Sequence, residues 1–249
     1  MTHPTPPPPT HSIQLYTLRH QLEQSPAATL SALATLGYTT VELAGLKGLT
    51  PTAFRRLLDD SGLRASSAHV PLRDTEAGVD EMLEDAATLG NTHLVIPMAR
   101  FDDADGWKRF AESLTAAAAK AKDQGIALGY HNHAHEFAPL PDGQRPYDVL
   151  TAYTDAALVH LELDFYWAVH AGVDPRDILG AHRGRVKQVH VKDRTLTGAM
   201  ADPGEGAIAF TDLIPMAERS GVVEFIVERD DSPDPLKTAK TGLDFLRTF

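Results

Sequence analysis

The 249-residue sequence contains no cysteine. This absence excludes disulfides, cysteine-ligated zinc, iron–sulfur clusters and a thiol nucleophile, so any metal must be held by histidine, aspartate and glutamate. Basic residues are scarce, because 23 Lys and Arg face 34 Asp and Glu and give a formal net charge of −11. An acidic excess works against the basic face that duplex binding requires, and we expect no nucleic-acid partner.

Long apolar runs are also absent. No segment approaches the ~20 apolar residues needed to cross a bilayer, and residues 1–11 (MTHPTPPPPTH) have neither the basic start nor the apolar stretch of a secretory signal. We expect a cytoplasmic protein with no membrane partner. We also expect residues 1–11 to form a disordered proline-rich leader and residues 12–249 to form one catalytic domain, since 43% hydrophobic and 23% charged residues are typical of a globular protein.

One local pattern recurs along the chain: a helical stretch rich in Ala and Leu, then a glycine, then a short β-branched run. The glycines are Gly37, Gly62, Gly90, Gly125 and Gly221. Each suits the left-handed residue just past a helix C-terminus. The pattern, with the first strand and two less clearly marked ones, predicts eight strands at residues 12–16, 39–43, 64–69, 93–97, 127–131, 159–164, 186–191 and 224–228.

Helical stretches fall between all of these strands, and a helix at residues 235–246 closes the set. Alternating strands and helices predict parallel pairing, and eight such units predict an α/β fold of the closed (β/α)₈ TIM-barrel type in a single domain. An open doubly wound sheet is the alternative. It is disfavoured because the sequence after the first strand, IQLYTLRHQLEQ, has no glycine-rich phosphate loop.

Polar side chains gather where the predicted strands end, which is where the active site of such a barrel lies. They are Gln14, Tyr16, Glu42, His69, His131, His133, Glu136, Asp164, His190, Lys192, Asp193 and Glu228. Packing alone does not explain buried carboxylates, because they are costly unless they are paired. A divalent cation would neutralise them. The donor set favours Mn²⁺ or Mg²⁺, with Zn²⁺ and Co²⁺ also possible.

Five segments resemble the xylose isomerase-like TIM-barrel superfamily, the sugar phosphate isomerase/epimerase family. These are GYHNHAHEF (129–137), LELDFYWAVHAGVDP (161–175), VHVKDR (189–194), PGEG (203–206) and FIVERD (225–230). The family includes tagatose and psicose epimerases, inosose dehydratases and enzymes of 3-keto-sugars. The resemblance implies one divalent ion held by glutamate, aspartate, histidine and glutamate from the fifth to eighth strands.

Three of these ligands carry over directly as Asp164, His190 and Glu228. The fourth departs from the pattern of the family's epimerases, in which the glutamate ends strand five. Here that strand ends in His131, and the first acidic residue after it is Glu136. We assign Glu136 as the fourth ligand, with His131 or His133 as the alternative.

The resemblance implies a divalent-metal-dependent isomerase or epimerase acting on a ketose or related polyhydroxy carbonyl compound. Proton abstraction next to the carbonyl would give a metal-stabilised enediolate. The catalytic candidates are Glu228, Glu136, His131 and Lys192, the last stabilising the developing charge. Substrate contacts are assigned to Gln14, Tyr16, Glu42, His69, His133 and Trp167.

Two of the substrate contacts have equally weighted structural readings. Glu42 could instead be a buried partner of Lys192, and His69 could be a hydrogen-bonded core residue.

Three other functions compete with this hypothesis. A dehydratase or lyase acting on an inosose or 3-keto-glycoside would use the same metal site and lose a β-hydroxyl or glycosidic oxygen after the same proton abstraction. An endonuclease IV-like nuclease needs more metal ligands than we find, and a non-catalytic sugar-binding barrel conflicts with the intact ligands on strands six to eight. The expected partner is a small sugar or cyclitol, and the sequence leaves a homo-oligomer open.

Overall fold

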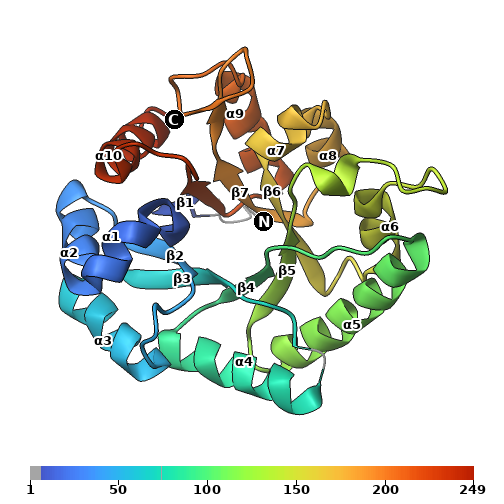
Figure 1. Ribbon diagram of the computed structural model, residues 1–249, viewed down its shortest axis with the longest axis horizontal. Coiled ribbons are helices and arrows are strands. Elements are labelled where there is room, and N and C mark those ends of the chain that lie inside the picture. Colours follow the sequence, from blue (N-terminus) through green and yellow to red (C-terminus); the bar gives the residue numbers. More distant parts are fainter. Residues whose placement is uncertain (1–6, 74) are drawn as a thin grey trace, which may run out of the picture.

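A computed structural model of the protein describes residues 7–73 and 75–249. Eight strands form one parallel sheet in the order β1-β10-β7-β6-β5-β4-β3-β2, and helices surround it (Figure 1). The strands are β1 (Thr10–Ile13), β2 (Thr40–Ala44), β3 (Arg64–His69), β4 (His93–Ile96), β5 (Ala127–His131), β6 (Val159–Asp164), β7 (Val186–Val191) and β10 (Glu224–Val227). A separate antiparallel pair consists of β8 (Asp193–Arg194) and β9 (Met200–Ala201).

The connections between strands are helical. The α-helices are α1 (Arg19–Gln24), α2 (Pro26–Leu36), α3 (Pro51–Ser61), α4 (Glu76–Leu89), α5 (Ala104–Asp123), α6 (Pro146–Tyr153), α7 (Phe165–His170), α8 (Pro175–Ala181), α9 (Phe210–Ser220) and α10 (Pro235–Leu246). Two 3₁₀ helices, η1 (Leu15–Leu18) and η2 (His135–Phe137), follow β1 and β5. No helix in the described part of the chain has the length and apolar character needed to span a membrane.

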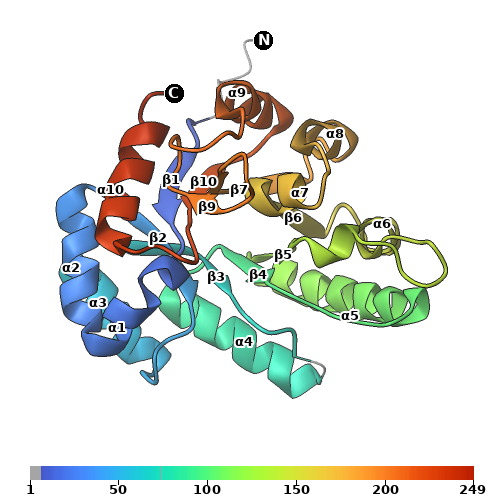
Figure 2. The same cartoon turned by 45° about the horizontal axis from the view of Figure 1, so that its top comes forward.

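The sheet closes into a barrel where its two outermost strands meet. Gln14, directly after β1, forms a parallel bridge with Glu42 of β2. On its other side β1 pairs with β10, and Figure 2 shows these two strands next to each other near α10. The predicted single-domain (β/α)₈ barrel is therefore confirmed, in place of the open doubly wound alternative.

Strand β1 is the largest departure from the predicted boundaries. It spans Thr10–Ile13 instead of residues 12–16, because the chain turns at Gln14 into η1. The side-chain oxygen of Gln14 caps that turn by accepting a hydrogen bond from the backbone N–H of Tyr16. The predicted leader, residues 1–11, overlaps the start of β1, and its residues 1–6 lie outside the described residues.

The helices end where the glycine pattern predicts. Gly37 terminates α2 with φ of 101°, and Gly90 terminates α4 with φ of 80°, which is a backbone region that a Cβ penalises. The alanine-rich face of α5 packs closely on the strands, with Leu114, Ala118 and Ala121 fully buried. Local sequence thus fixes the lengths of the repeating units that form the barrel wall.

A glycine and a histidine of neighbouring strands also meet inside the barrel at its lower layer. Gly129 of β5 pairs with His160 of β6, and the imidazole of His160 lies where a Cβ on Gly129 would stand. Polar side chains of Gln188 and Glu224 occupy the same layer, joined by a 2.9 Å hydrogen bond. The barrel interior is therefore polar over its depth, and the apolar core lies between strands and helices.

Candidate metal and catalytic site

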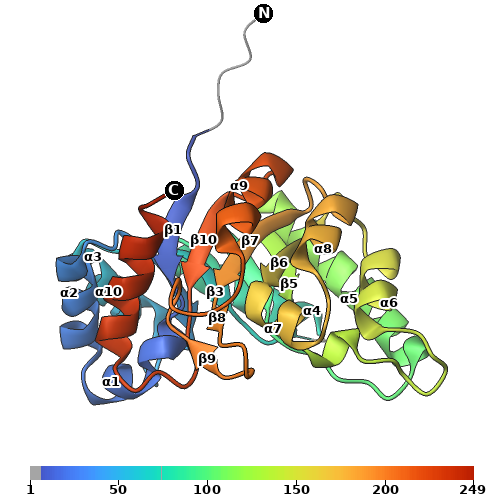
Figure 3. The same cartoon turned by 90° about the horizontal axis from the view of Figure 1, so that it is seen from above.

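Three predicted ligands come together at the C-terminal end of the barrel. Asp164 ends β6 and pairs in register with His190 of β7. Glu228 follows β10 directly, and β10 pairs with β7 through Val227 and Val191. In Figure 3 the β8–β9 pair, which follows β7, lies at the end of the barrel away from the start of β1.

The geometry of these three side chains fits a metal ion. Asp164, His190 and Glu228 are buried, and each offers one ligand atom within 4.8 Å of the others. Oδ2 of Asp164 is buried and makes no hydrogen bond, and its charged neighbour is the ammonium of Lys192 at 3.2 Å. Three carboxylates, those of Asp164, Glu228 and Asp230, surround one ammonium group, that of Lys192. The negative charge that remains suits a cation.

The electrostatics of the cluster favour the ionised forms of Glu228 and Lys192 and oppose ionisation of Asp164. Burial raises the pKa of Glu228, but Lys192 and His190 outweigh it and hold that pKa well below its usual range. Burial lowers the pKa of Lys192, but the carboxylates of Asp164, Glu228 and Asp230 outweigh it and raise that pKa. Burial is the main reason that the pKa of Asp164 is raised.

The structure does not bring Glu136 into this cluster. Its Oε1 accepts a 2.7 Å hydrogen bond from the hydroxyl of Tyr130, and its Oε2 accepts a 2.8 Å bond from the backbone N–H of His133. The chain turns into η2 after β5 and directs Glu136 back toward β5, so the predicted ligand lies apart from the others. His131 lies nearer, with Nε2 3.9 Å from Oδ2 of Asp164.

Glu162 is a residue that the sequence analysis missed. Its Oε2 lies 2.7 Å from Nε2 of His69, 2.9 Å from Nδ1 of His131 and 3.2 Å from Nε2 of His190. Burial raises the pKa of Glu162, but these three imidazoles outweigh it and hold the pKa well below its usual range. The sequence does contain a sign of this role. Glu162 lies two residues before Asp164 on β6, and side chains two residues apart on a strand point to the same face.

Glu42 lies behind the cluster of Asp164, His190 and Glu228 and is not one of its candidate metal ligands. Its carboxylate accepts hydrogen bonds from Nε2 of Gln14 at 2.7 Å and from Oγ of Ser67 at 2.6 Å. It also lies 2.8 Å from Nε2 of His190. Burial raises the pKa of Glu42 to about 7. The structure therefore places neither Gln14 nor Glu42 at the surface of a cavity, and Lys192 pairs with other carboxylates instead of Glu42.

A cavity of about 390 Å³ opens above the cluster, a size that suits a small molecule. It is lined by Tyr16, Ala44, His69, Pro97, Met98, His131, His133, Lys192, Glu228 and Asp230. The predicted contacts Tyr16, His69 and His133 are thus at the cavity. Trp167 lies beside it, with its ring 5.6 Å from that of His133 and 5.4 Å from Nζ of Lys192.

Shifted pKa values are found also for Asp230, His69 and His133 of this lining. Burial, and then the charge of Glu228, raises the pKa of Asp230 to about 7. Burial lowers the pKa of His69, but the carboxylates of Glu42 and Glu162 outweigh it and raise that pKa above its usual value. Burial is the main cause that lowers the pKa of His133 to about 3. Asp230, three residues past β10, was not predicted from the sequence.

Asp193 organises the loop that contains the PGEG segment. Its Oδ2 accepts hydrogen bonds from the backbone N–H groups of Gly204 at 3.0 Å and Gly206 at 2.8 Å, and its Oδ1 accepts one from that of Ile208 at 3.2 Å. These amides have the arrangement that would hold an anion. A carboxylate of the chain itself already occupies it.

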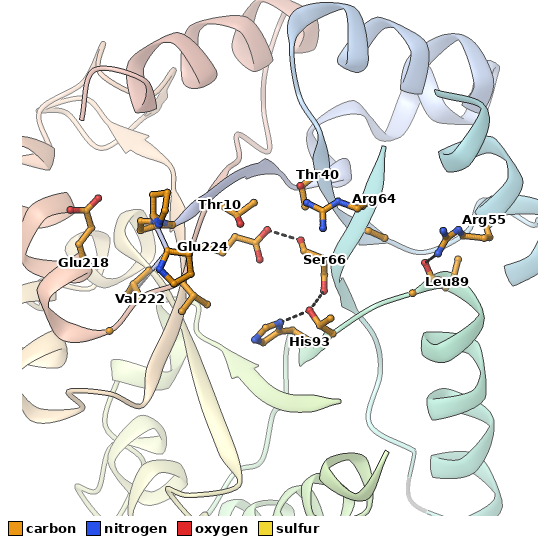
Figure 4. A pocket seen from close by; sticks show the side chains of 18 residues that line it. Thr10, Thr40, Arg55, Arg64, Ser66, Leu89, His93, Glu218, Val222 and Glu224 are labelled. Carbon is orange, nitrogen blue, oxygen red and sulfur yellow. Dashed lines mark hydrogen bonds between the residues drawn. The ribbon is translucent and has the colours of Figure 1, made fainter. Parts of the chain in front are cut away.

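A larger cavity, of about 650 Å³, lies at the opposite end of the barrel (Figure 4). The starts of the strands line it, including Thr10, Arg64, His93 and Glu224. Glu224 accepts a 2.6 Å hydrogen bond from Ser66. In barrels of this type catalytic sites occupy the other end, and the metal-ligand clusters found in residues 7–73 and 75–249 lie there too. We therefore place the active site in the smaller cavity.

Comparison with known proteins gives the family. A family model described as xylose isomerase-like TIM barrel matches residues 30–249. The inosose dehydratase of Geobacillus kaustophilus is 24% identical, and the match covers 87% of this chain and 85% of that one. The inosose dehydratase of Clostridium perfringens is 29% identical over 53% of this chain and 51% of its own, so the chain spans about half the length of that relative.

Among solved structures, a sugar phosphate isomerase/epimerase from Parabacteroides distasonis superimposes with a TM-score of 0.81 and 26% identity, covering 99% of this chain and 96% of that one. The resemblance seen in the sequence motifs is thereby confirmed over nearly the whole fold. The chain belongs to the xylose isomerase-like TIM-barrel family.

Proposed function

We propose that the protein is a metal-dependent lyase that removes water from a small polyhydroxylated carbonyl compound, such as an inosose. The observation that carries the proposal is the buried cluster of Asp164, His190 and Glu228 beneath a cavity lined by further proton-carrying side chains. Relatives named inosose dehydratase support this reaction better than the isomerase or epimerase that the sequence motifs favoured.

Asp164, His190 and Glu228 would hold the divalent ion, and His131 is the fourth ligand that we propose. Its Nε2 is the nearest imidazole nitrogen of β5 to Asp164, whereas Glu136 is engaged with Tyr130. An ion bound there supplies a Lewis acid for the carbonyl oxygen of the substrate. Two carboxylates and two imidazole nitrogens are donors that Mn²⁺, Mg²⁺, Zn²⁺ and Co²⁺ all accept.

Removal of water needs a base for a carbon-bound proton and an acid for the departing hydroxyl. Asp230 is the lining carboxylate outside the ligand cluster, and we assign it as the base. His69 is the acid, because its Nε2 faces Glu162 at 2.7 Å and its Nδ1 is left for a ligand. The carbon-bound proton passes to Asp230, and the hydroxyl leaves as water with the proton from His69.

Lys192 stabilises the negative charge that develops on the carbonyl oxygen as the carbon-bound proton leaves. Its ammonium is buried at the floor of the cavity and held by Glu228 at 2.8 Å and Asp230 at 3.0 Å. A fixed charge in a water-poor site needs little reorganisation during the reaction, and this makes it effective.

The lining favours a substrate without a phosphate group. Among the described residues that line the cavity there is no arginine, and Lys192 is already paired with three carboxylates. The backbone amides of Gly204 and Gly206, which could have bound an anion, are taken by Asp193. A neutral cyclitol ketone or 3-keto-glycoside fits this charge distribution.

The test is to incubate metal-loaded protein in D₂O with a panel of inososes, ketoses and 3-keto-glycosides and to analyse the products by NMR and mass spectrometry. Loss of one water, or of the aglycone from a glycoside, supports the lyase. Deuterium uptake next to the carbonyl without mass loss would instead identify an isomerase or epimerase. No change in any substrate, with the Asp164→Asn variant as the blank, would overturn both.

A further inference from the structure

We propose that two buried carboxylates one layer below the candidate metal site act as positioning residues for its histidines. Glu42 holds the ring orientation of His190 through its Nε2. Glu162 holds that of His131 through its Nδ1. The inference deepens the proposed metal site and rests on it, because a histidine binds an ion only through a nitrogen that carries a free lone pair.

His190 is held through both of its ring nitrogens. Nδ1 faces the cluster, 2.8 Å from Oε2 of Glu228, and Nε2 lies 2.8 Å from Oε1 of Glu42. That same oxygen of Glu42 already accepts a hydrogen bond from the amide of Gln14, which can only donate through its nitrogen. Oε1 is thus an acceptor for a hydrogen on Nε2 of His190. Nδ1 is the nitrogen on the side of the cluster, where an ion would take the place of a hydrogen facing Glu228.

His131 shows the same arrangement with the nitrogens exchanged. Nδ1 lies 2.9 Å from Oε2 of Glu162, and Nε2 lies 3.9 Å from Oδ2 of Asp164. Glu162 is 1% exposed, and His69 approaches the same oxygen at 2.7 Å. An oxygen between two imidazoles is an acceptor for both. Nδ1 of His131 therefore carries the hydrogen, and Nε2 is free on the side of Asp164.

Pairing of a ligand histidine with a carboxylate through its second nitrogen raises the basicity of the ligand and fixes its ring. The inner carboxylates gain their own fixed positions from the barrel wall. Ser67 of β3 donates to Oε2 of Glu42 at 2.6 Å. Glu162 sits on the inner face of β6, one inward position before Asp164. The strands of the barrel wall therefore fix the positions of the two carboxylates and, through them, the ring orientations of the two histidines.

The same residues could be interpreted as a second metal site. His69, His131, Glu162 and His190 each offer a ligand atom within 4.8 Å of the others. That site would need Nε2 of His190, which contacts Glu42, while the upper cluster needs Nδ1 of the same ring. A neutral imidazole has one free lone pair, so both sites cannot be filled through it. We favour the positioning role, and stoichiometry tests it.

The test measures the affinity of the full-length protein for Co²⁺ by competition with a chromophoric chelator. Glu42→Gln and Glu162→Gln are each expected to weaken binding by about 10-fold to 100-fold, as loss of such partners usually does. Ser67→Ala is a milder variant, which removes a support of Glu42 and should weaken binding by a few-fold. This variant still tests the role of Glu42 if the glutamate variants fold poorly.

Glu224→Gln is the matched control. Glu224 is a buried carboxylate of the layer below, bonded to Ser66 and Gln188, and its contacts include none of the histidines of the cluster. Its replacement makes the same change of charge at similar depth, so Co²⁺ affinity should equal that of the wild type.

A second readout is the exchange of the ring N–H hydrogens with water, observed by ¹⁵N NMR of histidine-labelled protein loaded with Zn²⁺. We expect slowly exchanging hydrogens on Nε2 of His190 and on Nδ1 of His131 in the wild type, and faster exchange of the respective hydrogen in Glu42→Gln and Glu162→Gln. A purely structural role for the carboxylates would leave both exchange rates unchanged.

The outcomes separate the inference from the function on which it rests. If the wild type bound no Co²⁺, the metal site itself would be refuted. If the wild type bound one ion and both glutamate variants matched Glu224→Gln, the positioning role alone would be refuted. Two ions per chain, with one lost in Glu162→Gln, would assign the inner set as a metal site and overturn the proposal.

Discussion

Nζ of Lys192 lies 2.8 Å from Oε2 of Glu228, the same oxygen that lies 2.8 Å from Nδ1 of His190. One carboxylate oxygen thus joins the charge-stabilising amine to a candidate metal ligand. The amine is buried and is further held by Asp164 at 3.2 Å. Because the amine is not itself a candidate ligand, changing the lysine alone tests its part in the chemistry apart from metal binding.

Lys192→Met is expected to lower kcat on the true substrate by about 10² to 10³, the range seen when a preorganised electrostatic group is removed. KM should change little and metal content should stay at the wild-type value. Steady-state kinetics with elemental analysis checks both. Lys108→Met is the control, because Lys108 pairs with Asp105 on the surface of α5. An unchanged kcat in Lys192→Met would leave that lysine with a structural role only.

The fifth strand provides a comparison between two neighbouring candidates. His131→Gln should lower the affinity for the ion, because a neutral amide is a poorer ligand than an imidazole, whereas Glu136→Gln should bind the ion as the wild type does. Elemental analysis after dialysis against a weak chelator measures the difference, with Asp164→Ala as the variant expected to lose the metal. Retention of metal by His131→Gln together with its loss from Glu136→Gln would restore the ligand predicted from the sequence.

His160 makes stability depend on pH. Burial, and then the nearby His93, lowers its pKa from 6.5 to about 4, so the unfolded chain binds a proton at a higher pH than the folded chain does. Burial of neutral His160 therefore contributes fully to the free energy of unfolding above pH 6.5. This contribution, about 3 kcal/mol in all, is lost as pH falls toward 4. Urea unfolding of the wild type and His160→Gln at pH 7.5 and 4.5 checks this. The wild type should lose more stability than the variant between these pH values, and parallel losses would contradict the prediction.

Gly129 is expected to tolerate no side chain. A Cβ there would collide with the ring of His160, and overpacking of this kind costs about 1–3 kcal/mol. Gly129→Ala should therefore shift the urea midpoint downward. Gly180→Ala in α8 is the control, since the structure shows open space at its Cβ position and an ordinary helical φ, and it should be neutral or slightly stabilising. Equal midpoints for the two variants would refute the close packing.

The barrel could be predicted because its signals are local. The bounds of β3, β5, β6 and β7 follow from runs of sequence that end at glycines and polar residues, and the structure reproduces them. Asp164, His190 and Glu228 were singled out because each lies at or next to the end of a strand, and the family resemblance implied their role as ligands. Side-chain identity and strand order suffice to bring such residues to one end of a barrel.

The rest of the site depends on contacts across the barrel. Nothing within β2 indicates that Glu42 meets His190 of β7, and nothing within β6 indicates that Glu162 collects three imidazoles. The misplacement of Glu136 has a different cause. The direction of the chain after β5 is set by η2 and the hydroxyl of Tyr130, and the spacing of residues along the sequence carries no sign of it.

The closure of the barrel by β1, which pairs with β10 and bridges to β2, has a consequence for the order of folding. Strand β1 is made first but finds its neighbour β10 only at the far end of the sequence, in the pairing of Thr10 with Glu224. Contacts so distant along the chain form late, and a nascent sheet keeps an open edge until then. Glu42 and His190 stand on strands far apart in the sheet order, so the final closure that completes the wall also brings them into contact. We therefore expect a folding intermediate in which β10 has not yet joined the sheet to contain most of its helices and strands and yet to bind metal weakly. Glu228 and the contact between Glu42 and His190 both reach their positions only with the final closure.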